Sequence, residues 1–242
     1  MEQLTKAEVE AIKKLNTARL ISKLARVGYS EEELETMDTE ALMNAWSICV
    51  AEGKDKPTGL VTPPTATGYD EYKEIERQIA ATCSLPIVIE SVVRIENVEV
   101  FQSHEVLRKS FMLKFGVDDP NMLRLFHGTK HHNVDQISAN GFQKNCEMGT
   151  FGTAVYAAVK FQTAIQYTDP DPAGRRCMFI CRAVAGRPAV ASAKVSLNAP
   201  PYLDTEQMIR FTCVKDARFN PEVYAFFEEK LVYPEYVVYF FC

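Results

Sequence analysis

The sequence predicts an α+β protein in which a small helical domain precedes a larger domain of strands and helices. Over 4–52, apolar side chains recur at the three- to four-residue spacing of amphipathic helices. From 86 to 101, the run PIVIESVVRIENVEVF alternates β-branched and polar residues, which is typical of strands. The segment between them, GKDKPTGLVTPPTATG, is rich in Gly, Pro and Thr and indicates a linker. We therefore expect a helical domain over 1–57, a linker over 58–67 and the larger domain over 68–242.

Length and charge limit the kinds of partner. The chain has 242 residues, enough for one full domain and a small second one. Its 27 Lys and Arg against 32 Asp and Glu give a net charge of −5. Residues 1–67 hold 8 basic and 11 acidic side chains, and residues 68–242 hold the remaining 19 and 21. Because neither part has the basic excess that binds phosphates, a nucleic-acid partner is disfavoured.

The cysteine pattern and the hydropathy favour an intracellular protein. The seven cysteines are scattered, without a CxxC pair, which favours reduced and mostly buried thiols over disulfides or a zinc site. The N-terminal MEQLTKAEVE has neither a basic start nor an apolar core, and no apolar stretch approaches 18 residues. We expect neither secretion nor a membrane partner, and we place the protein in the cytosol or the nucleus.

The N-terminal segment is interpreted as three helices. Ser30 with Glu33 forms a capping box for the second helix, and Asp38 or Thr39 could cap a third over 40–51. The outline resembles SAP-like or UBA-like helical modules, a pattern that any compact helical hairpin also gives. Because the segment is acidic, DNA binding is disfavoured. We expect a module that packs within the protein or that binds an unidentified partner protein.

The larger domain begins with elements that lead to a candidate site. In order, we expect a helix over 69–83, strands over 86–101, a helix over 104–115, an apolar strand over 123–126 and a helix that ends at 140–141.

The strand over 123–126 ends in His127, Gly128 and Thr129. A Gly at this point lets a ligand approach the backbone, and one residue of free strand backbone offers an N–H and a C=O, the complement of a carboxamide. The His127 imidazole beside it can donate to a ribose hydroxyl. A lone His at a strand end more often serves the fold, so the residues alone leave both interpretations open.

The segment LRLFHGTKHHNVDQISANGF resembles the opening of the NAD site in the poly(ADP-ribose) polymerase family along its whole length. Members of that family carry a His-Gly-Ser/Thr triplet and an Asn four residues after its third member. The resemblance implies that Gly128 holds the nicotinamide amide and that His127 bonds the adenosine-side ribose. It also implies that Thr129 and Asn133 lie toward the adenosine.

A second segment, GTFGTAVYAAVKFQTAIQY, resembles the part of the family that carries two Tyr around a short helix. Here these are Tyr156 and Tyr167. Two rings so placed can sandwich a flat nicotinamide, a contact worth about 0.5–1.5 kcal/mol per pair. The alternative is two core tyrosines. Ala164 stands where the family has a Ser that bonds the nicotinamide amide, and Thr163 could serve if the register slips by one residue.

The segment FTCVKDARFNPEVYAFFEEKLVYPEYVVYFFC resembles the C-terminal end of the mono-ADP-ribosylating branch of the family. In this register, Val223 takes the position of the Glu that completes the His-Tyr-Glu set of the poly-ADP-ribosylating members. The run YPEYVVY would make Glu235 that residue instead. We prefer Val223 because the segment then aligns without gaps, and Glu235 falls in the turn before the last strand. Strand alternation points Glu222 to the opposite face.

The resemblance implies the ADP-ribosyltransferase fold, in which two packed sheets, mixed or antiparallel, have flanking helices. NAD+ would be the co-substrate without a metal, and His127, Tyr156 and Val223 would form the catalytic set. Without the carboxylate, the chain would transfer one ADP-ribose unit to a protein side chain, including its own, or to a nucleic-acid end. Ala154, Ala164 and Val223 together motivate the alternative of an inactive relative that serves as a binding module.

Overall fold

The computed structural model describes residues 29–42, 44–45, 58–61, 69–144, 149–191 and 197–242, together with Thr17, Ile21 and Leu24. The chain divides into two compact units, 1–56 and 57–242. In the part described, no helix is both long and apolar enough to cross a membrane.

Most of the described residues of the first unit are helical. Its helix α2, Glu31–Thr36, opens with the predicted capping box: Glu33 N–H donates to Ser30 Oγ (3.3 Å), and Ser30 N–H donates to the Glu33 carboxylate (2.8 Å). Ala41 N–H donates to Asp38 Oδ1 (2.8 Å), so Asp38 caps the next helical turn. Thr17, Ile21, Leu24 and the residues 39–42 and 44–45 are also helical, and the other residues of the expected helices over 4–52 lie outside the described ones. The small helical domain stays a prediction. A buried cluster here contains Leu24, Leu34, Leu42 and Ala45.

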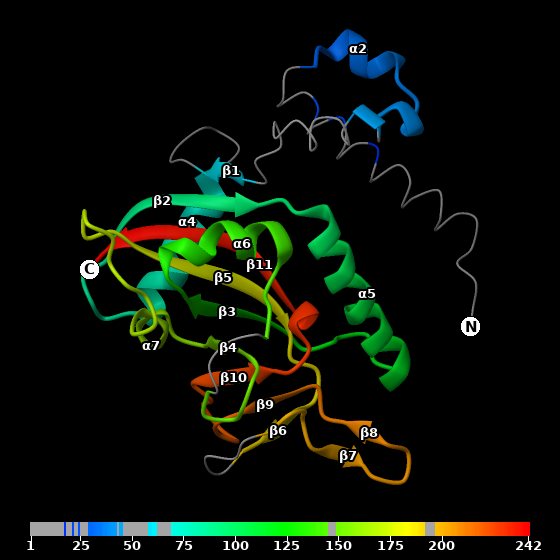
Figure 1. Ribbon diagram of the computed structural model, residues 1–242, viewed down its shortest axis with the longest axis vertical. Helices are drawn as coiled ribbons and strands as arrows, with labels where there is room; N and C mark the ends of the chain where they lie inside the picture. The colour runs from blue at the N-terminus through cyan, green and yellow to red at the C-terminus, as the bar shows by residue number, and fades with distance from the viewer. Residues whose placement is uncertain are drawn as a thin grey trace. The chain divides into compact units, whose positions relative to one another are not determined.

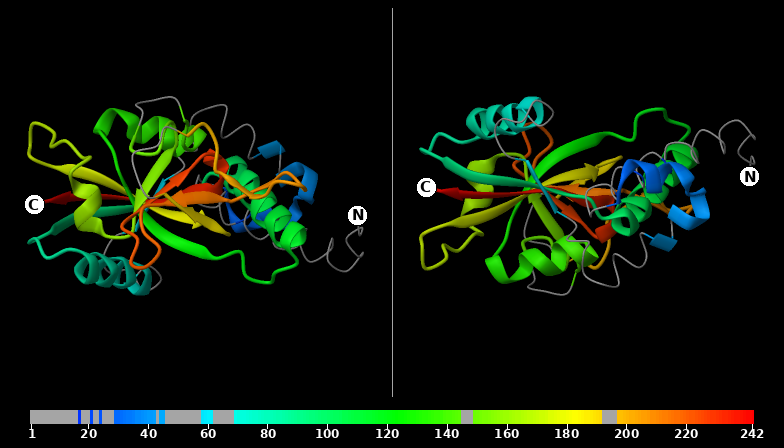
Figure 2. Two further views of the ribbon diagram at one scale, coloured as in Figure 1. Left: turned by 90° about the horizontal axis from the view of Figure 1, so that it is seen from below. Right: turned by 90° about the horizontal axis from the view of Figure 1, so that it is seen from above.

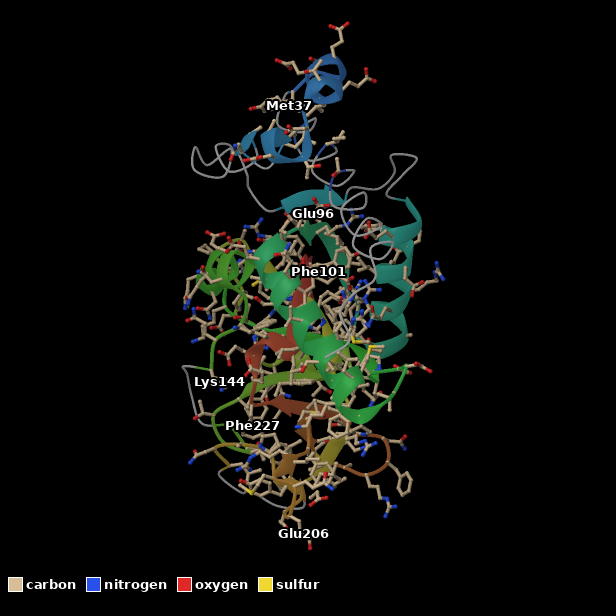
Figure 3. All side chains as sticks on the ribbon, turned by 90° about the vertical axis from the view of Figure 1, so that its right-hand side faces the viewer. Met37, Glu96, Phe101, Lys144, Glu206 and Phe227 are labelled. Carbon is tan, nitrogen blue, oxygen red and sulfur yellow. The ribbon has the colours of Figure 1, made fainter. Side chains whose placement is uncertain are left out.

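The second unit is built on a nine-stranded sheet in the order β1-β2-β11-β5-β3-β4-β10-β9-β6 (Figure 1). Neighbouring strands are antiparallel, except that β6 and β9 are parallel. A separate hairpin of β7 and β8 has its tip near Glu206 (Figure 3). The strands are β1 (Thr58–Val61), β2 (Val88–Ile95), β3 (Met122–Gly128), β4 (Val155–Ala158), β5 (Arg176–Val184), β6 (Pro188–Val190), β7 (Tyr202–Asp204), β8 (Ile209–Arg210), β9 (Cys213–Lys215), β10 (Val223–Phe226) and β11 (Val232–Phe241).

Helices cover both faces of this sheet, and Figure 2 shows α4 and α6 on opposite faces. Apolar residues of α4 and α7 join one core cluster, whereas those of α5 and α6 pack against another. The helical segments are α4 (Tyr69–Thr82), α5 (Val98–Phe115), η1 (His131–Asn133), α6 (Val134–Asn140), α7 (Phe161–Ile165) and η2 (Glu229–Leu231).

The two faces of the sheet carry different cores. The sheet has two halves, which meet between β3 and β4. On the face that we call inner, Leu125 of β3 and Phe226 of β10 belong to one cluster drawn from both halves. The outer face carries two separate clusters. One contains Phe126 and reaches Ala158 of β4, and the other contains Ala225. The two sheets expected from the sequence are thus two halves of one sheet, folded around the inner core. The halves are joined by a single pair between β3 and β4, Phe126–Ala158.

Two further elements differ from the sequence prediction. The stretch 58–67, expected to be a linker, contains β1, because β2 offers an edge with which it can pair. The run over 86–101 is strand only as far as Ile95, and α5 begins at Val98. The reason is Asn97, whose Oδ1 accepts from Val100 N–H (3.1 Å) and caps the helix.

The cysteines that the structure describes are all free. Cys177, Cys181 and Cys213 are buried, as predicted, while Cys83 is half-buried and Cys242 is exposed. Burial raises the pKa of the Cys177 thiol to about 11 and that of Cys213 to about 12. The buried thiols are therefore protonated and unreactive at neutral pH.

Candidate active site

The predicted site residues gather where β3 and β4 separate. The ladder between these strands consists of the pair Phe126–Ala158, and within the described register His127 and Gly128 have no partner on β4. β3 stays paired with β5 along its whole length. If the ladder to β4 continued, Gly128 would stand opposite Tyr156. We call this interruption of the ladder the β3–β4 opening.

The strand register assigns each side chain to a face of the sheet. Val223 lies opposite Ala158, two residues beyond Tyr156, so strand alternation directs Val223 and Tyr156 to the same outer face. Gly128 also faces outward, toward α7. His127, one residue earlier, projects to the inner face. Gly128, Tyr156 and Val223 thus share the outer face beside the β3–β4 opening, and His127 is linked to Tyr156 by a hydrogen bond to its backbone oxygen.

The half-buried His127 imidazole spans the β3–β4 opening. Its Nδ1 lies 2.7 Å from the backbone oxygen of Tyr156. Because a carbonyl only accepts, Nδ1 carries the proton and Nε2 of the neutral ring keeps a free lone pair. Burial lowers the pKa of His127 more than the Tyr156 carbonyl raises it, which keeps the ring neutral at neutral pH. This corrects the expectation that His127 donates to a ribose hydroxyl, because Nε2 would accept from it.

Gly128 lies directly against α7. A Cβ at this position would clash with the backbone oxygen of Ala164 and lie 3.1 Å from Tyr167 Cβ. The Ala164 side chain is buried in the outer-face core, so it does not line the β3–β4 opening. Thr163, on the same helix, is half-buried. The Tyr167 ring is 62% exposed and is free to stack on a ligand beside Gly128.

Thr129 and Asn133 bond to each other. The Asn133 side-chain amide donates to Thr129 Oγ1 (3.2 Å), and the Thr129 side chain is buried. The thiol of Cys177 donates to the backbone oxygen of Thr129 (3.4 Å). These bonds fix the turn between β3 and α6, which holds the end of β3 in place.

The turn before β4 engages the hydroxyl of Tyr156. The hydroxyl donates to Gly152 O (2.7 Å) and accepts from Phe151 N–H (2.8 Å). The ring stacks on Phe151, with 6.4 Å between centroids, and a Cβ at Gly149 would clash with it. Burial raises the pKa of the Tyr156 phenol more than the Phe151 bond lowers it, and the nearby Tyr167 phenol adds to the rise. Of the two rings predicted to stack on the nicotinamide, that of Tyr167 is exposed, whereas that of Tyr156 is held by its own turn.

Val223 opens β10 and is half-buried. Its N–H donates to Asp216 Oδ1 (3.3 Å), and its carbonyl accepts from Asp216 N–H (3.2 Å). The adjacent Glu222 is exposed and forms an ion pair with Lys160 (3.4 Å). Val223 therefore offers the ribose no carboxylate, and the neighbouring carboxylate is held by a lysine.

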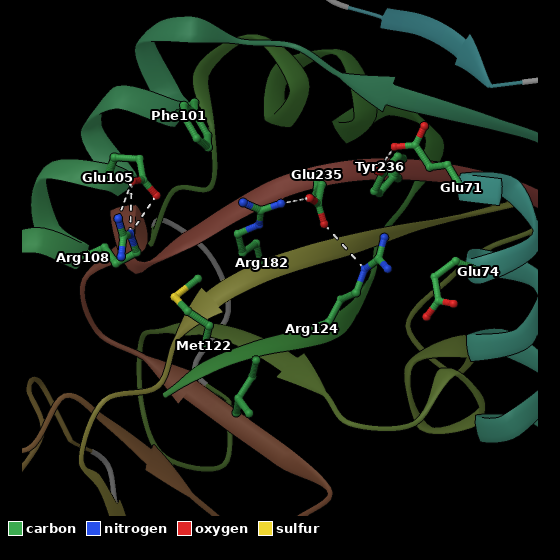
Figure 4. A pocket seen from close by; sticks show the side chains of 11 residues that line it. Glu71, Glu74, Phe101, Glu105, Arg108, Met122, Arg124, Arg182, Glu235 and Tyr236 are labelled. Carbon is green, nitrogen blue, oxygen red and sulfur yellow. Dashed lines mark hydrogen bonds and ion pairs between the residues drawn. The ribbon is translucent and has the colours of Figure 1, made fainter. Parts of the chain in front are cut away.

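Glu235 lies in a different groove of the outer face (Figure 4). It bonds Arg182 and forms an ion pair with Arg124 (3.5 Å). It sits at a bulge inside β11, which corrects the expectation that it lies in a turn before that strand. Its carboxylate is thus held by two arginines in this groove, and the choice of Val223 as the position of the family Glu stays a prediction.

Two grooves of the second unit lie outside the predicted site. The groove around Glu235 has a volume of about 630 Å³. Another, of about 510 Å³, has Lys144 and Phe227 in its wall (Figure 3). Neither is lined by His127 or Gly128. Within the described ranges, no three His, Cys, Asp or Glu side chains gather as metal ligands.

Phe142 is the site residue that the sequence argument misses. Its ring meets the His127 imidazole edge-on, with 4.8 Å between centroids. The available signal is the Gly-Phe pair at the end of LRLFHGTKHHNVDQISANGF, which the sequence argument uses only for the end of a helix at 140–141.

Comparison with known proteins agrees with the resemblance. The sequence-family model of the poly(ADP-ribose) polymerase catalytic domain matches residues 69–241 of this chain. The human protein mono-ADP-ribosyltransferase PARP14 is 27% identical over 176 residues, 70% of this chain and 10% of its own length. Mouse protein mono-ADP-ribosyltransferase PARP10 is 24% identical over 69% of this chain and 18% of its own. A probable poly [ADP-ribose] polymerase of Dictyostelium discoideum is 24% identical over 71% of this chain and 50% of its own. The chain thus spans half or less of the length of these relatives.

Proposed function

Because the chain belongs to the family of poly(ADP-ribose) polymerase catalytic domains, we propose that it is an NAD+-dependent mono-ADP-ribosyltransferase. It would transfer one ADP-ribose unit to a protein side chain, its own included, and release nicotinamide. One observation carries the proposal: Gly128 and the exposed Tyr167 lie against each other at the β3–β4 opening, and the neutral His127 imidazole bonds the Tyr156 backbone oxygen across it.

In this proposal, each residue at the opening has a role in binding NAD+. The Gly128 backbone would bond the carboxamide, and the Tyr167 ring would stack on the nicotinamide. The Nε2 lone pair of His127 would accept a hydroxyl of the adenosine-side ribose. Thr129 and Asn133 would lie toward the adenosine and fix the turn, while Thr163 is the hydroxyl-bearing residue of α7 nearest the missing Ser position.

In the reaction, the bond between nicotinamide and ribose breaks, and nicotinamide leaves with the bonding electron pair. Positive charge builds on the ribose, as in other glycosyl transfers. An acceptor carboxylate or thiolate then bonds the anomeric carbon. The protein contributes by orienting the donor for this step.

Val223 explains why we propose single-unit transfer. A carboxylate at this position would stabilise the ribose charge and would activate the hydroxyl of a growing chain. Valine does neither, so elongation should fail. Transfer of one unit needs only an acceptor that brings its own negative charge.

The first test is binding of NAD+ or benzamide, measured by thermal shift. We expect a saturable rise in melting temperature that Tyr167→Ala abolishes, because the exposed ring supplies the stacking contact. Phe219→Ala is the control, since Phe219 is also exposed (78%) and belongs to no part of the site. No shift at millimolar NAD+ would contradict a working nicotinamide pocket.

Activity is tested by incubation with labelled NAD+. We expect label on the protein itself or on an acceptor protein, in single units, and its loss in His127→Ala. Label in chains would contradict the role given to Val223.

A second candidate function is that of an inactive binding module. The observation that favours it is the anchored Tyr156, whose hydroxyl is engaged by its own turn, together with the absence of a carboxylate at Val223. NAD+ turnover that depends on His127 would exclude this alternative.

We also propose roles for the remaining parts of the chain. The N-terminal helical residues would bind a partner protein or pack within the protein. The free cysteines that the structure describes suit a reducing compartment, so the cytosol or the nucleus is the proposed location.

A further inference from the structure

The His127 imidazole is held on two sides by groups from distant parts of the chain. The backbone oxygen of Tyr156 accepts its Nδ1–H at 2.7 Å. The Phe142 ring meets it edge-on, at 4.8 Å between centroids and 65° between planes. The first contact fixes which nitrogen carries the proton. The second contact restricts rotation of the imidazole ring about its Cβ–Cγ bond.

We propose that Phe142 is a positioning residue, whose ring holds the His127 imidazole in the orientation that presents Nε2 to the NAD+ ribose. The inference rests on the proposed function for the identity of the ligand. The contact between the two rings stands independently of any ligand.

Phe142 is itself firmly placed. It is buried, and its ring packs edge-on against Phe179, which is fully buried, at 5.9 Å between centroids. Phe142 follows Gly141, whose N–H bonds Ile137 O (2.9 Å) and whose φ of +75° ends α6. The position of Phe142 is thus set by the end of a helix and by the inner core.

An aromatic neighbour suits a neutral imidazole. Edge-on aromatic pairs are stabilised by about 0.5–1.5 kcal/mol beyond simple burial. The pKa of His127 is lowered by burial and raised by the Tyr156 carbonyl, and in the described part of the chain no charged side chain contributes to it. Removing the Phe142 ring would free the imidazole to rotate and would admit water beside it. Both changes reduce the fraction of molecules with Nε2 ready for the ribose.

The test uses the full chain labelled with ¹⁵N in its histidine rings, followed by NMR without ligand. We expect the natural chain to show one tautomer at His127, protonated at Nδ1, across neutral pH. In Phe142→Leu we expect averaging of the two ring nitrogens and a higher pKa at His127. The His127 signals are assigned from their loss in His127→Gln.

Phe240→Leu is the matched control. Phe240 is also fully buried with an edge-on aromatic partner, Phe161 at 4.9 Å, and makes no ring contact with His127. It should lower thermal stability as Phe142→Leu does, yet leave the His127 signals unchanged. If Phe142→Leu does not fold, Phe142→Met fills the site with a flexible side chain and replaces it.

A second measurement is NAD+ affinity by titration calorimetry. We expect a loss of about three- to tenfold in Phe142→Leu, the factor that one aromatic contact represents, and no change in Phe240→Leu. Unchanged His127 signals in Phe142→Leu would overturn the inference. Changed signals in a protein that never binds NAD+ would instead reject the proposed function and leave the positioning role standing.

Discussion

At Gly128, one residue meets two separate requirements. α7 passes so close that a Cβ would clash with the Ala164 backbone oxygen, and the proposed nicotinamide needs the same backbone uncovered. The sequence indicates only the second requirement, because the approach of α7 is a tertiary contact without a local signal. His127 is similar. Its position can be predicted from the sequence, but its tautomer depends on a carbonyl 29 residues away.

We expect Gly128→Ala to lower the free energy of unfolding by about 1–3 kcal/mol, the usual cost of overpacking, and to abolish benzamide binding. Urea unfolding and thermal shift measure the two effects. Gly174→Ala is the control, because a Cβ there meets nothing within 4 Å while φ is +83°. It should cost stability and leave binding intact. Normal benzamide affinity in Gly128→Ala would show that the carboxamide binds elsewhere.

Val223→Glu should raise the rate of NAD+ cleavage, because it adds a carboxylate on the outer face beside Tyr156. A single electrostatic contact of this kind is typically worth about 10²–10³ in rate. Nicotinamide release is the measurement, and Val223→Gln is the neutral control of similar size. Equal rates in the two variants would mean that a charge at this position does not reach the ribose.

Among the elements, α5 is held by side chains outside any recognised motif. Asn97 caps its first turn and also donates to Ala139 O (2.6 Å), at the end of α6. His104 is fully buried, and its Nδ1 lies 3.0 Å from Lys230 O of η2. Its Nε2 has no hydrogen-bond partner within the described residues.

His104 should make the fold sensitive to acid. Burial lowers its pKa more than the Lys230 carbonyl and Glu105 raise it, and the pKa of His127 is lowered in the same sense. The unfolded chain binds these protons near pH 6.5, whereas the folded protein binds them only at lower pH. The contribution of these two neutral histidines to the free energy of unfolding is therefore complete above about pH 6.5 and is lost as the pH falls.

We expect a lower urea midpoint at about pH 5 than at about pH 7.5. His104→Leu should make this dependence shallower, because it removes one of the two groups. A midpoint that falls equally in both proteins would assign the acid sensitivity to other groups.

Local patterns predict the elements between α4 and α6 in outline, and the exceptions have physical causes. The helix that becomes α4 is predicted from a long amphipathic run, and the strand that becomes β3 is predicted from a short apolar one. The start of α5 is missed because Val98 and Val100 look like strand residues, and the cap at Asn97 outweighs them. β1 is missed because 58–61 gains its structure from the edge of β2 rather than from its own sequence.

At the scale of the whole molecule, the proposed site lies where the two halves of the sheet meet. Both halves share the inner core, whereas the outer face carries two clusters, the first of which includes Ala158 of β4. The resemblance gives the architecture in outline. It does not give the continuous sheet, because pairing across the junction depends on the single contact Phe126–Ala158.

We expect residues 57–242 alone to keep the urea midpoint and the benzamide binding of the whole chain, because this unit holds its own core clusters. A chain shortened further, to begin at residue 69, should be less stable and should self-associate in size-exclusion chromatography. It lacks β1 and leaves the edge of β2 bare. A lower midpoint for 57–242 would mean that the first unit contributes to the fold.

The single pair between β3 and β4 should also affect the rate of amide hydrogen exchange. Amide hydrogens along this line should exchange with solvent sooner than those of β5 and β11, whose ladders are long. A nicotinamide held between Gly128 and the tyrosines would clasp both halves and slow that exchange. Bound NAD+ would then make the whole sheet more rigid, before the bond between nicotinamide and ribose is broken.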